Sequence, residues 1–139
     1  QKPDSLTPEE YAIIREHPRL GAQILRKIGF LEEVAQVIFT HHEWFDGSGY
    51  PTGLSGNDIP IVARIVAIMD TYDAMTTTRP YRKGRPPEEA VREIRRCAGR
   101  QFDINVVKAF IRAFRKGDID GTLRQRTGRA ASARNYDLV

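Results

Sequence analysis

Two adjacent histidines, His41 and His42, stand where helical periodicity predicts apolar residues. Each of them continues a stripe of apolar residues at spacings of three and four within residues 34–39. The chain has three histidines, and the third is His17. Because successive residues of an α-helix differ in direction by about 100°, the adjacent pair is expected to address two points rather than one. Such a pair suits two metal ions held side by side.

Asp70 is a second polar residue in an unexpected place, since it follows an apolar helical face formed by residues 59–66. A carboxylate on an apolar face is costly unless it is paired or binds a metal. Two interpretations stay open, an ion pair with Arg64 or Arg79 and a metal ligand. His17, taken alone, is better explained as a capping or core histidine than as a ligand.

Together these residues offer imidazole nitrogens and a carboxylate oxygen but no thiolate. That donor set suits Fe, Mn, Zn or Ni, and the spacing matches no zinc-finger pattern. Two such ions a few ångströms apart lower the pKa of a bridging water and hold both the attacking and the leaving oxygens of a phosphodiester. The residues alone therefore favour a metal-dependent hydrolase of a phosphorylated ligand.

The net charge of +4 is concentrated between Arg79 and Arg100, where cations far outnumber acids. One interpretation is a solvated helix face with ion pairs such as Glu88 with Arg92. The other is a positive rim for an anionic, phosphate-bearing ligand. Charge alone favours the solvated face.

Helix patterns dominate the chain and no strand pattern appears, so the sequence predicts an all-α fold. The predicted helices cover residues 7–17, 18–29, 31–43, 61–77, 86–99 and 105–116, with Thr7 as the first N-cap and a break at Pro18. A Gly- and Pro-rich loop interrupts them at residues 44–60, a length that is usually functional or disordered. The domain is expected to span residues 1–116, followed by a tail or linker over residues 117–139.

Composition places the chain among ordinary soluble domains, with 40% hydrophobic and 29% charged residues in 139. No apolar run approaches the length of a membrane span. The single cysteine, Cys97, excludes an internal disulfide, and a reducing cytoplasm is the default location. The opening residues Gln1-Lys2-Pro3 show neither an initiator methionine nor a helix start, so we expect a fragment of a longer protein.

Residues 41–51, His-His-Glu-Trp-Phe-Asp-Gly-Ser-Gly-Tyr-Pro, resemble the HHExxDGxGYP motif of HD-GYP domains. Further segments fit that family in the expected order: Lys2-Pro3, Leu6-Thr7, His17-Pro18, Gly21, Ile24-Leu25, Gly53-Leu54, Ile59-Pro60, Ala63-Arg64-Ile65, Asp70, Asp73-Ala74-Met75-Thr76, Arg79-Pro80-Tyr81-Arg82, Gly99, Gln101-Phe102-Asp103 and Phe110. The resemblance covers about residues 1–116 and is far more specific than a short glycine motif.

The resemblance implies a bacterial signalling module with an HD-superfamily helical fold. Such domains hydrolyse cyclic di-GMP to the linear dinucleotide and GMP with two or three divalent metal ions, for which we favour Fe or Mn, with Zn or Ni as alternatives. By motif position the metal ligands are His17, His41, His42 and Asp70. The residues that shape or contact the substrate pocket are Gly49, Tyr50, Pro51, Asp73, Arg79 and Arg82. Glu43 and Asp46 are expected to brace the loop, Asp46 through the backbone N–H groups of the following turn.

Three departures from the family pattern matter. The upstream helix ligand and the HD dyad with its lysine are absent, so the metal site is expected to be incomplete and this chain to have little or no activity, whereas its longer parent is active. Met69 stands where a small residue is usual beside the aspartate. Ile104 stands where proline usually follows the Phe-Asp pair.

The expected partners follow from the same resemblance. Loss of the upstream helices should expose apolar faces of the helices that carry His41 and Asp70, which predicts a homodimer. The substrate is a cyclic dinucleotide, and neither nucleic acid binding nor membrane insertion is expected. The alternative function is a non-catalytic module that binds cyclic di-GMP or docks a diguanylate cyclase (GGDEF) partner. A third is a related hydrolase of the hybrid cyclic GMP-AMP.

Overall fold

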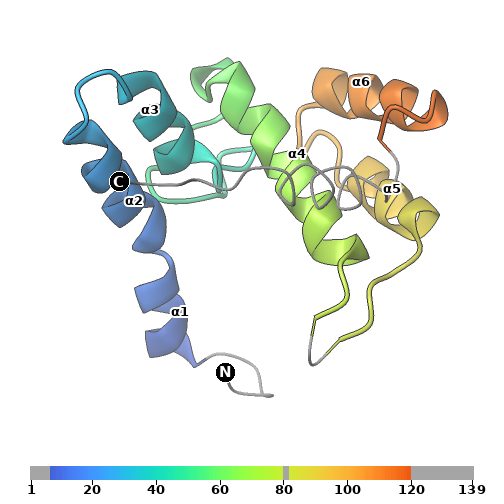
Figure 1. The fold of residues 1–139 in the computed structure, drawn as a ribbon, viewed down its shortest axis with the longest axis horizontal. Helices are drawn as coiled ribbons and strands as arrows, with labels where there is room; N and C mark the ends of the chain where they lie inside the picture. The colour runs from blue at the N-terminus through green and yellow to red at the C-terminus, as the bar shows by residue number, and fades with distance from the viewer. Residues whose placement is uncertain (1–6, 80–81, 120–139) are drawn as a thin grey trace, which may run out of the picture.

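The computed structural model describes residues 7–79 and 82–119. Within these residues the chain is helical, with two isolated β-bridges and no strand, so the all-α prediction is confirmed. The elements are α1 (Pro8–Ile14), α2 (His17–Arg26), α3 (Glu32–Thr40), a short 3₁₀ helix (Gly56–Asp58), α4 (Ile61–Thr76), α5 (Pro87–Arg96) and α6 (Ile104–Arg115) (Figure 1). Of the predicted tail or linker, residues 120–139 lie outside the described residues, as do Pro80 and Tyr81.

The first two helices are separated as predicted. Thr7 and Glu10 form a capping box, in which the Thr7 hydroxyl accepts from the Glu10 N–H and the Glu10 carboxylate accepts from the Thr7 N–H. The predicted break falls slightly earlier than expected, because α1 ends at Ile14 and α2 begins at His17. Pro18 thus occupies the first turn of α2, where a missing N–H costs nothing.

Helix α3 ends at Thr40, three residues before the predicted end at residue 43. The Thr40 hydroxyl donates to the carbonyl oxygen of Gln36 at 2.8 Å, and His41 is the C-cap. His41 and His42 therefore lie in a turn, where the regular angle between successive helical residues does not apply.

The hydrophobic core lies among α4, α5 and α6. It is formed by buried side chains of these helices and of the turn before α6: Ile68, Tyr72, Ala90, Ile94, Phe102, Val106, Val107 and Phe110. Helices α2 and α3 pack against each other beside this core, and α3 meets α4 (Figure 1). This half of the molecule is thinly covered, since Val34 of α3 and Val62 of α4 are 46% and 51% exposed. The predicted exposure of apolar faces on these two helices is confirmed. None of the helices in the described part of the chain is both long and apolar enough to cross a membrane.

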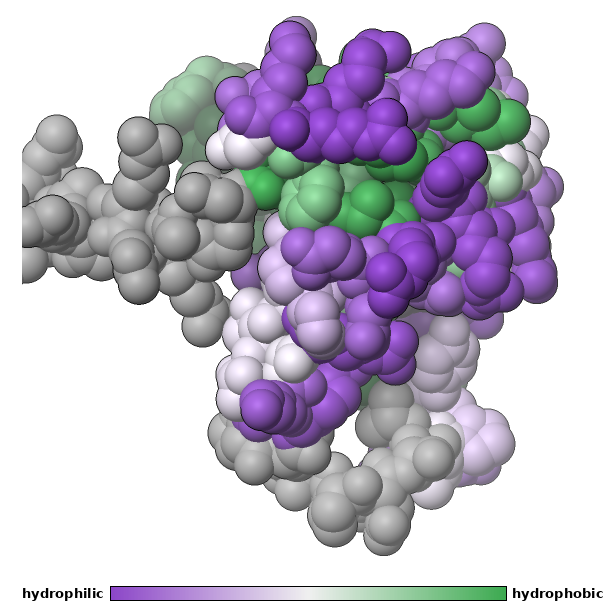
Figure 2. Space-filling view, turned by 90° about the vertical axis from the view of Figure 1, so that its right-hand side faces the viewer, coloured by the Kyte–Doolittle hydropathy of each residue, from purple (hydrophilic) through white to green (hydrophobic). Residues whose placement is uncertain are grey.

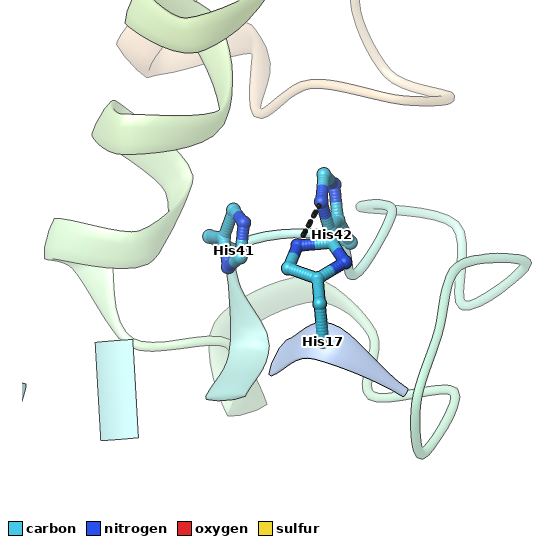
Figure 3. Close-up of side chains that lie close together, drawn as sticks. All are labelled: His17, His41 and His42. Atoms are coloured by element: carbon cyan, nitrogen blue, oxygen red, sulfur yellow. Dashed lines mark hydrogen bonds between the residues drawn. The ribbon is translucent and has the colours of Figure 1, made fainter. Parts of the chain in front are cut away.

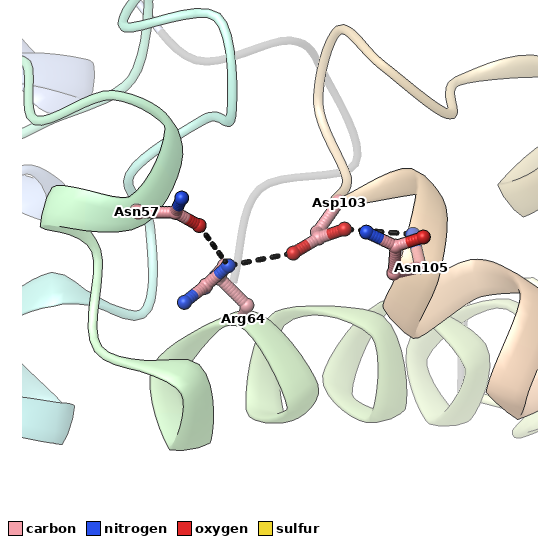
Figure 4. Close-up of polar contacts among 4 residues, drawn as sticks. All are labelled: Asn57, Arg64, Asp103 and Asn105. Carbon is pink, nitrogen blue, oxygen red and sulfur yellow. Dashed lines mark hydrogen bonds and ion pairs between the residues drawn. The ribbon is translucent and has the colours of Figure 1, made fainter.

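A buried ion pair ties α4 to the start of α6 (Figure 4). The Arg64 guanidinium donates to a carboxylate oxygen of Asp103 at 2.6 Å and to the Asn57 side-chain oxygen at 3.0 Å. The other Asp103 oxygen accepts from the backbone N–H of Asn105 at 2.7 Å and caps α6. Arg64 is therefore committed to Asp103, and the proposed pairing of Arg64 with Asp70 is wrong.

Candidate metal centre

Three histidines from two separate parts of the chain converge at one place (Figure 3). His17 is the first residue of α2, and His41 and His42 follow α3. One ring nitrogen from each lies within 4.8 Å of the others. The helical geometry expected for His41 and His42 is wrong, because α3 ends before them and the turn places their ring centroids 4.0 Å apart.

Backbone carbonyls fix the orientation of two of these imidazoles. Nδ1 of His17 lies 2.6 Å from the carbonyl oxygen of Ile14, and Nδ1 of His41 lies 2.7 Å from that of Ile38. A carbonyl only accepts, so each Nδ1 carries the proton and donates it. In the neutral imidazole this leaves the lone pair on Nε2 of each ring, which is the arrangement that metal-binding histidines adopt.

The third imidazole completes a site with the dimensions of a metal centre. Nε2 of His42 lies 3.1 Å from Nε2 of His17. For nitrogens about 2.1 Å from one ion, ligands at right angles lie about 3.0 Å apart and opposed ligands about 4.2 Å. The 3.1 Å separation between His17 and His42 matches the first value, and all three nitrogens lie within 4.8 Å of one another. These residues fit a divalent metal.

The protonation state of His42 also suits a ligand. Burial, followed by the charges of His41 and His17, lowers the pKa of His42 from 6.5 to about 4, and the opposing effect of Asp70 is smaller. The His42 imidazole is therefore neutral at pH 7. A ligand that is already deprotonated loses no affinity to protons at that pH.

Asp70 lies close to this cluster without belonging to it. Its carboxylate borders a hollow of about 240 Å³ together with His41 and His42, and its charge acts on His42. The Asp70 side chain is exposed, so the predicted buried apolar stripe is wrong at this position. The face of α4 that carries Asp70 and Val62 has little cover in the described part of the chain. Asp70 has no hydrogen-bond or ion-pair partner there, which leaves both of its oxygens available.

Glu43 holds the loop that follows the histidines. Its carboxylate is 3% exposed and accepts from the Thr52 N–H and hydroxyl, both at 2.7 Å, and from the Gly53 N–H. The predicted bracing role of Glu43 is confirmed. Asp46 acts as expected too, since one of its oxygens accepts from the N–H and the hydroxyl of Ser48.

Gly49 allows the loop to return onto the histidine turn. A Cβ at this position would lie 2.2 Å from the backbone nitrogen of Trp44 and 2.6 Å from the carbonyl oxygen of His42. The next residue, Tyr50, donates its N–H to that same His42 carbonyl at 3.2 Å. Only glycine fits so close an approach of two backbones.

The Tyr50 ring contacts both the His42 imidazole and the Arg15 guanidinium. It stacks on the His42 imidazole, with centroids 4.9 Å apart and planes at 28°, and the Arg15 guanidinium carbon lies 4.8 Å from its centroid. Burial raises the pKa of the Tyr50 hydroxyl above its usual 10.0, so the phenol stays protonated. The sequence motifs drew attention to Tyr50 and missed Arg15, which no pattern singles out except its place two residues before His17.

Comparison with known proteins defines the family of this chain. A sequence profile described as HD domain matches residues 1–106. The chain belongs to the HD domain family. This HD domain is 45% identical over 113 residues to a cyclic di-GMP phosphodiesterase of Thermotoga maritima, an alignment that covers 80% of the chain and 31% of that protein.

Two solved structures resemble this HD domain closely. A cyclic GMP-AMP-specific phosphodiesterase of Vibrio cholerae superposes with a TM-score of 0.62 at 28% identity, over 86% of this chain and 29% of that chain. An HDG"Y"P protein from Bdellovibrio bacteriovorus superposes with a TM-score of 0.61 at 28% identity, over 78% and 34% of the two chains. The resemblance to HD-GYP domains is confirmed, and the chain spans about a third of the length of these relatives.

The remaining predicted substrate residues of the HD domain lie on the last turn of α4 and on the connection that follows it. Asp73 is exposed and accepts from the Thr77 hydroxyl at 3.1 Å. Arg79 and Arg82 lie on the connection between α4 and α5, where their backbones form a bridge and the Arg82 guanidinium donates to the Ala74 carbonyl. The hollow beside His41 and His42 is not lined by any of these three residues.

Proposed function

We propose that the natural protein containing this HD domain is a metal-dependent phosphodiesterase that hydrolyses cyclic di-GMP to the linear dinucleotide and then GMP. The observation that carries the proposal is the convergence of His17, His41 and His42 beside Tyr50, inside an HHExxDGxGYP motif. The names of its relatives support a cyclic dinucleotide as the substrate.

The three histidines and Asp70 would hold two or three divalent ions, for which we favour Fe or Mn. Bound ions would supply Lewis acidity toward a phosphodiester oxygen and lower the pKa of a coordinated water. The protein contributes the orientation of the ligands, through the carbonyls of Ile14 and Ile38. These four side chains cannot fill two six-coordinate ions, so we expect little or no turnover by the 139-residue chain alone.

Substrate recognition is assigned to the GYP loop and to the nearby cations. Tyr50, flanked by Gly49 and Pro51, presents an aromatic ring beside the metal cluster, and Arg15 adds a positive charge against that ring. Cyclic di-GMP offers two anionic diesters and two flat bases, which such groups bind by charge and by stacking. We keep Asp73, Arg79 and Arg82 as proposed substrate contacts. A cytoplasmic location suits this role and the single cysteine.

A homodimer remains our expectation for this chain. Apolar side chains on the surface near the metal cluster, such as Leu20 at 55% and Ile24 at 64% exposure, would be covered by a second copy. Analytical ultracentrifugation at micromolar concentration checks this directly. A monomer throughout that range would contradict it.

Two alternatives share the same fold. The hybrid cyclic GMP-AMP is an alternative substrate, favoured by the similarity to the Vibrio cholerae structure. A non-catalytic module would instead bind cyclic di-GMP or dock a diguanylate cyclase (GGDEF) partner through the GYP loop.

One experiment separates these functions. The full-length natural protein, loaded with Fe²⁺ or Mn²⁺, is incubated with cyclic di-GMP or with cyclic GMP-AMP, and the products are separated by chromatography. We expect faster hydrolysis of cyclic di-GMP, and loss of at least about a hundredfold in rate for the double variant His41→Ala, His42→Ala. The exposed neighbour variant Arg19→Ala serves as the control and should retain activity. Unchanged activity of the double variant would refute the site, and nucleotide binding without turnover would favour the non-catalytic module.

A further inference from the structure

A groove between α5 and α6 lies outside the site described above and has a distinct chemical character. It consists of a hollow of about 520 Å³ and an adjoining hollow of about 240 Å³, which share Arg95, Ile111 and Arg115. Its floor is apolar and is formed by Val91, Ile104, Val107, Ile111 and Phe114. In Figure 2 this floor appears as a hydrophobic strip between two bands of hydrophilic side chains.

The rim of this α5–α6 groove is strongly basic. The cations that line it come from both helices: Arg92 and Arg95 from α5, and Lys108, Arg112 and Arg115 from α6. Glu88 is the one acid in the lining of the two hollows. On α5 the lining residues Glu88, Val91, Arg92 and Arg95 follow one another at helical spacing, so they share one face.

None of these five cations has an ion-pair partner within residues 7–79 and 82–119. Other arginines of the domain do have one, since Arg64 pairs with Asp103, Arg96 with Glu93 and Arg100 with Asp46. The ion pair expected between Glu88 and Arg92 does not form. The α5–α6 groove therefore keeps an uncompensated positive potential above its apolar floor, in place of the internal ion pairs of the solvated-face interpretation.

We infer that the α5–α6 groove docks an acidic amphipathic helix of a partner protein. An apolar floor favours an apolar ridge, and cations on both sides favour acidic residues on both flanks of that ridge. The 10 residues of α5 and the 12 of α6 are about 15 and 18 Å long, which matches about three turns of a docked helix.

Charge also decides between the candidate occupants. A second copy of this chain carries a net charge of +4, which opposes its approach to a basic groove. A nucleic acid would satisfy the cations and leave the apolar floor, with Ile104 at 45% exposure, without a partner. An acidic amphipathic helix satisfies both parts of the surface.

The test measures binding of a synthetic probe to the 139-residue chain. The probe is a fluorescein-labelled helix of about 14 residues, with leucines at spacings of three and four and glutamates on both flanks. A matched probe carries glutamine in place of each glutamate. By fluorescence anisotropy we expect the glutamate probe to bind at least about tenfold more tightly, and its affinity to fall with added salt.

Variants locate the binding to the groove. The double variant Arg95→Gln, Arg112→Gln should weaken the glutamate probe about fivefold to thirtyfold, whereas Arg95→Lys, Arg112→Lys should restore most of the affinity. Ile111→Ser should weaken both probes. Arg96→Gln is the matched control on the same helix, because Arg96 does not line the groove, and it should leave affinity unchanged.

Several outcomes would overturn the inference. Equal affinity for the two probes would remove the charge argument, and equal effects of the double glutamine variant and of Arg96→Gln would contradict the location of the binding site. Displacement of the probe by a DNA duplex would identify nucleic acid as the occupant. Self-association that the double glutamine variant abolishes would identify a second copy. Circular dichroism of each variant separates loss of binding from loss of folding.

Discussion

Replacement of Asp103 by serine tests the buried ion pair that ties α4 to α6. The side chains of Arg64 and Asp103 are 13% and 6% exposed, and their charged atoms lie 2.6 Å apart. Serine is also a good N-cap, so Asp103→Ser removes the ion pair and keeps the hydrogen bond to the Asn105 N–H. Asp103→Ala removes both interactions.

The expected cost follows from what Arg64 keeps. Breaking a buried pair by removing one partner costs about 3–5 kcal/mol, because the remaining charge is left buried without compensation. Arg64 retains the Asn57 oxygen at 3.0 Å, while its Nε has no hydrogen-bond partner in the described part of the chain. We therefore expect the lower value, about 3 kcal/mol, for Asp103→Ser. Asp103→Ala should cost about 1 kcal/mol more, because α6 loses its cap.

Urea unfolding followed by circular dichroism at 222 nm measures these free energies. The double variant Arg64→Leu, Asp103→Ser should recover part of the loss, because it removes the stranded charge. Glu93→Gln breaks the exposed pair with Arg96 and serves as the control, with a much smaller shift of the midpoint expected. A loss below about 1 kcal/mol for Asp103→Ser would refute the assignment of this pair as the link between α4 and α6.

Two further predictions concern the loop beside the metal cluster. Gly49→Ala should destabilise the chain by more than about 2 kcal/mol and displace Tyr50 from His42, because the new Cβ would lie 2.2 Å from the Trp44 nitrogen. Thermal unfolding measures the loss of stability, and NMR spectra report the ring-current shift caused by stacking of Tyr50 on His42. Unchanged NMR spectra would contradict the displacement. Glu43→Gln should cost about 1.5–3 kcal/mol, because glutamine lacks the charge and keeps one acceptor oxygen, so the Gly53 N–H faces an amide nitrogen that cannot accept. Hydrogen exchange should quicken at Gly53, and native protection there would contradict the bracing role.

Apolar periodicity, capping residues and the positions of glycine and proline were sufficient to predict the helices and the long loop. The Thr7 capping box and the break near Pro18 are local features, so the sequence contains them fully. The end of α3 is different, because its pattern continues through His41 and His42 while the backbone turns after Thr40. That turn is set by tertiary contacts of the loop, such as Tyr50 N–H to the His42 carbonyl, which no window of sequence contains.

The candidate site was predictable in its residue types more than in its geometry. The motif identified the histidines and the bracing roles of Glu43 and Asp46, because these contacts are within a few residues of the loop. It did not predict that His41 and His42 lie in a turn after α3, nor that Asp70 is exposed. Arg15 was missed, because its contact with Tyr50 joins positions 15 and 50, which only the folded chain brings together.

Metal binding by the 139-residue chain is the most direct test of the central claim. Titration with Co²⁺, followed by its visible absorption, reports nitrogen coordination in the wild-type chain and in the variant with His17, His41 and His42 all replaced by alanine. We predict a saturable spectrum for the wild type and none for the variant, with Arg19→Ala behaving as the wild type. Equal spectra for the wild-type chain and the triple variant would contradict the account.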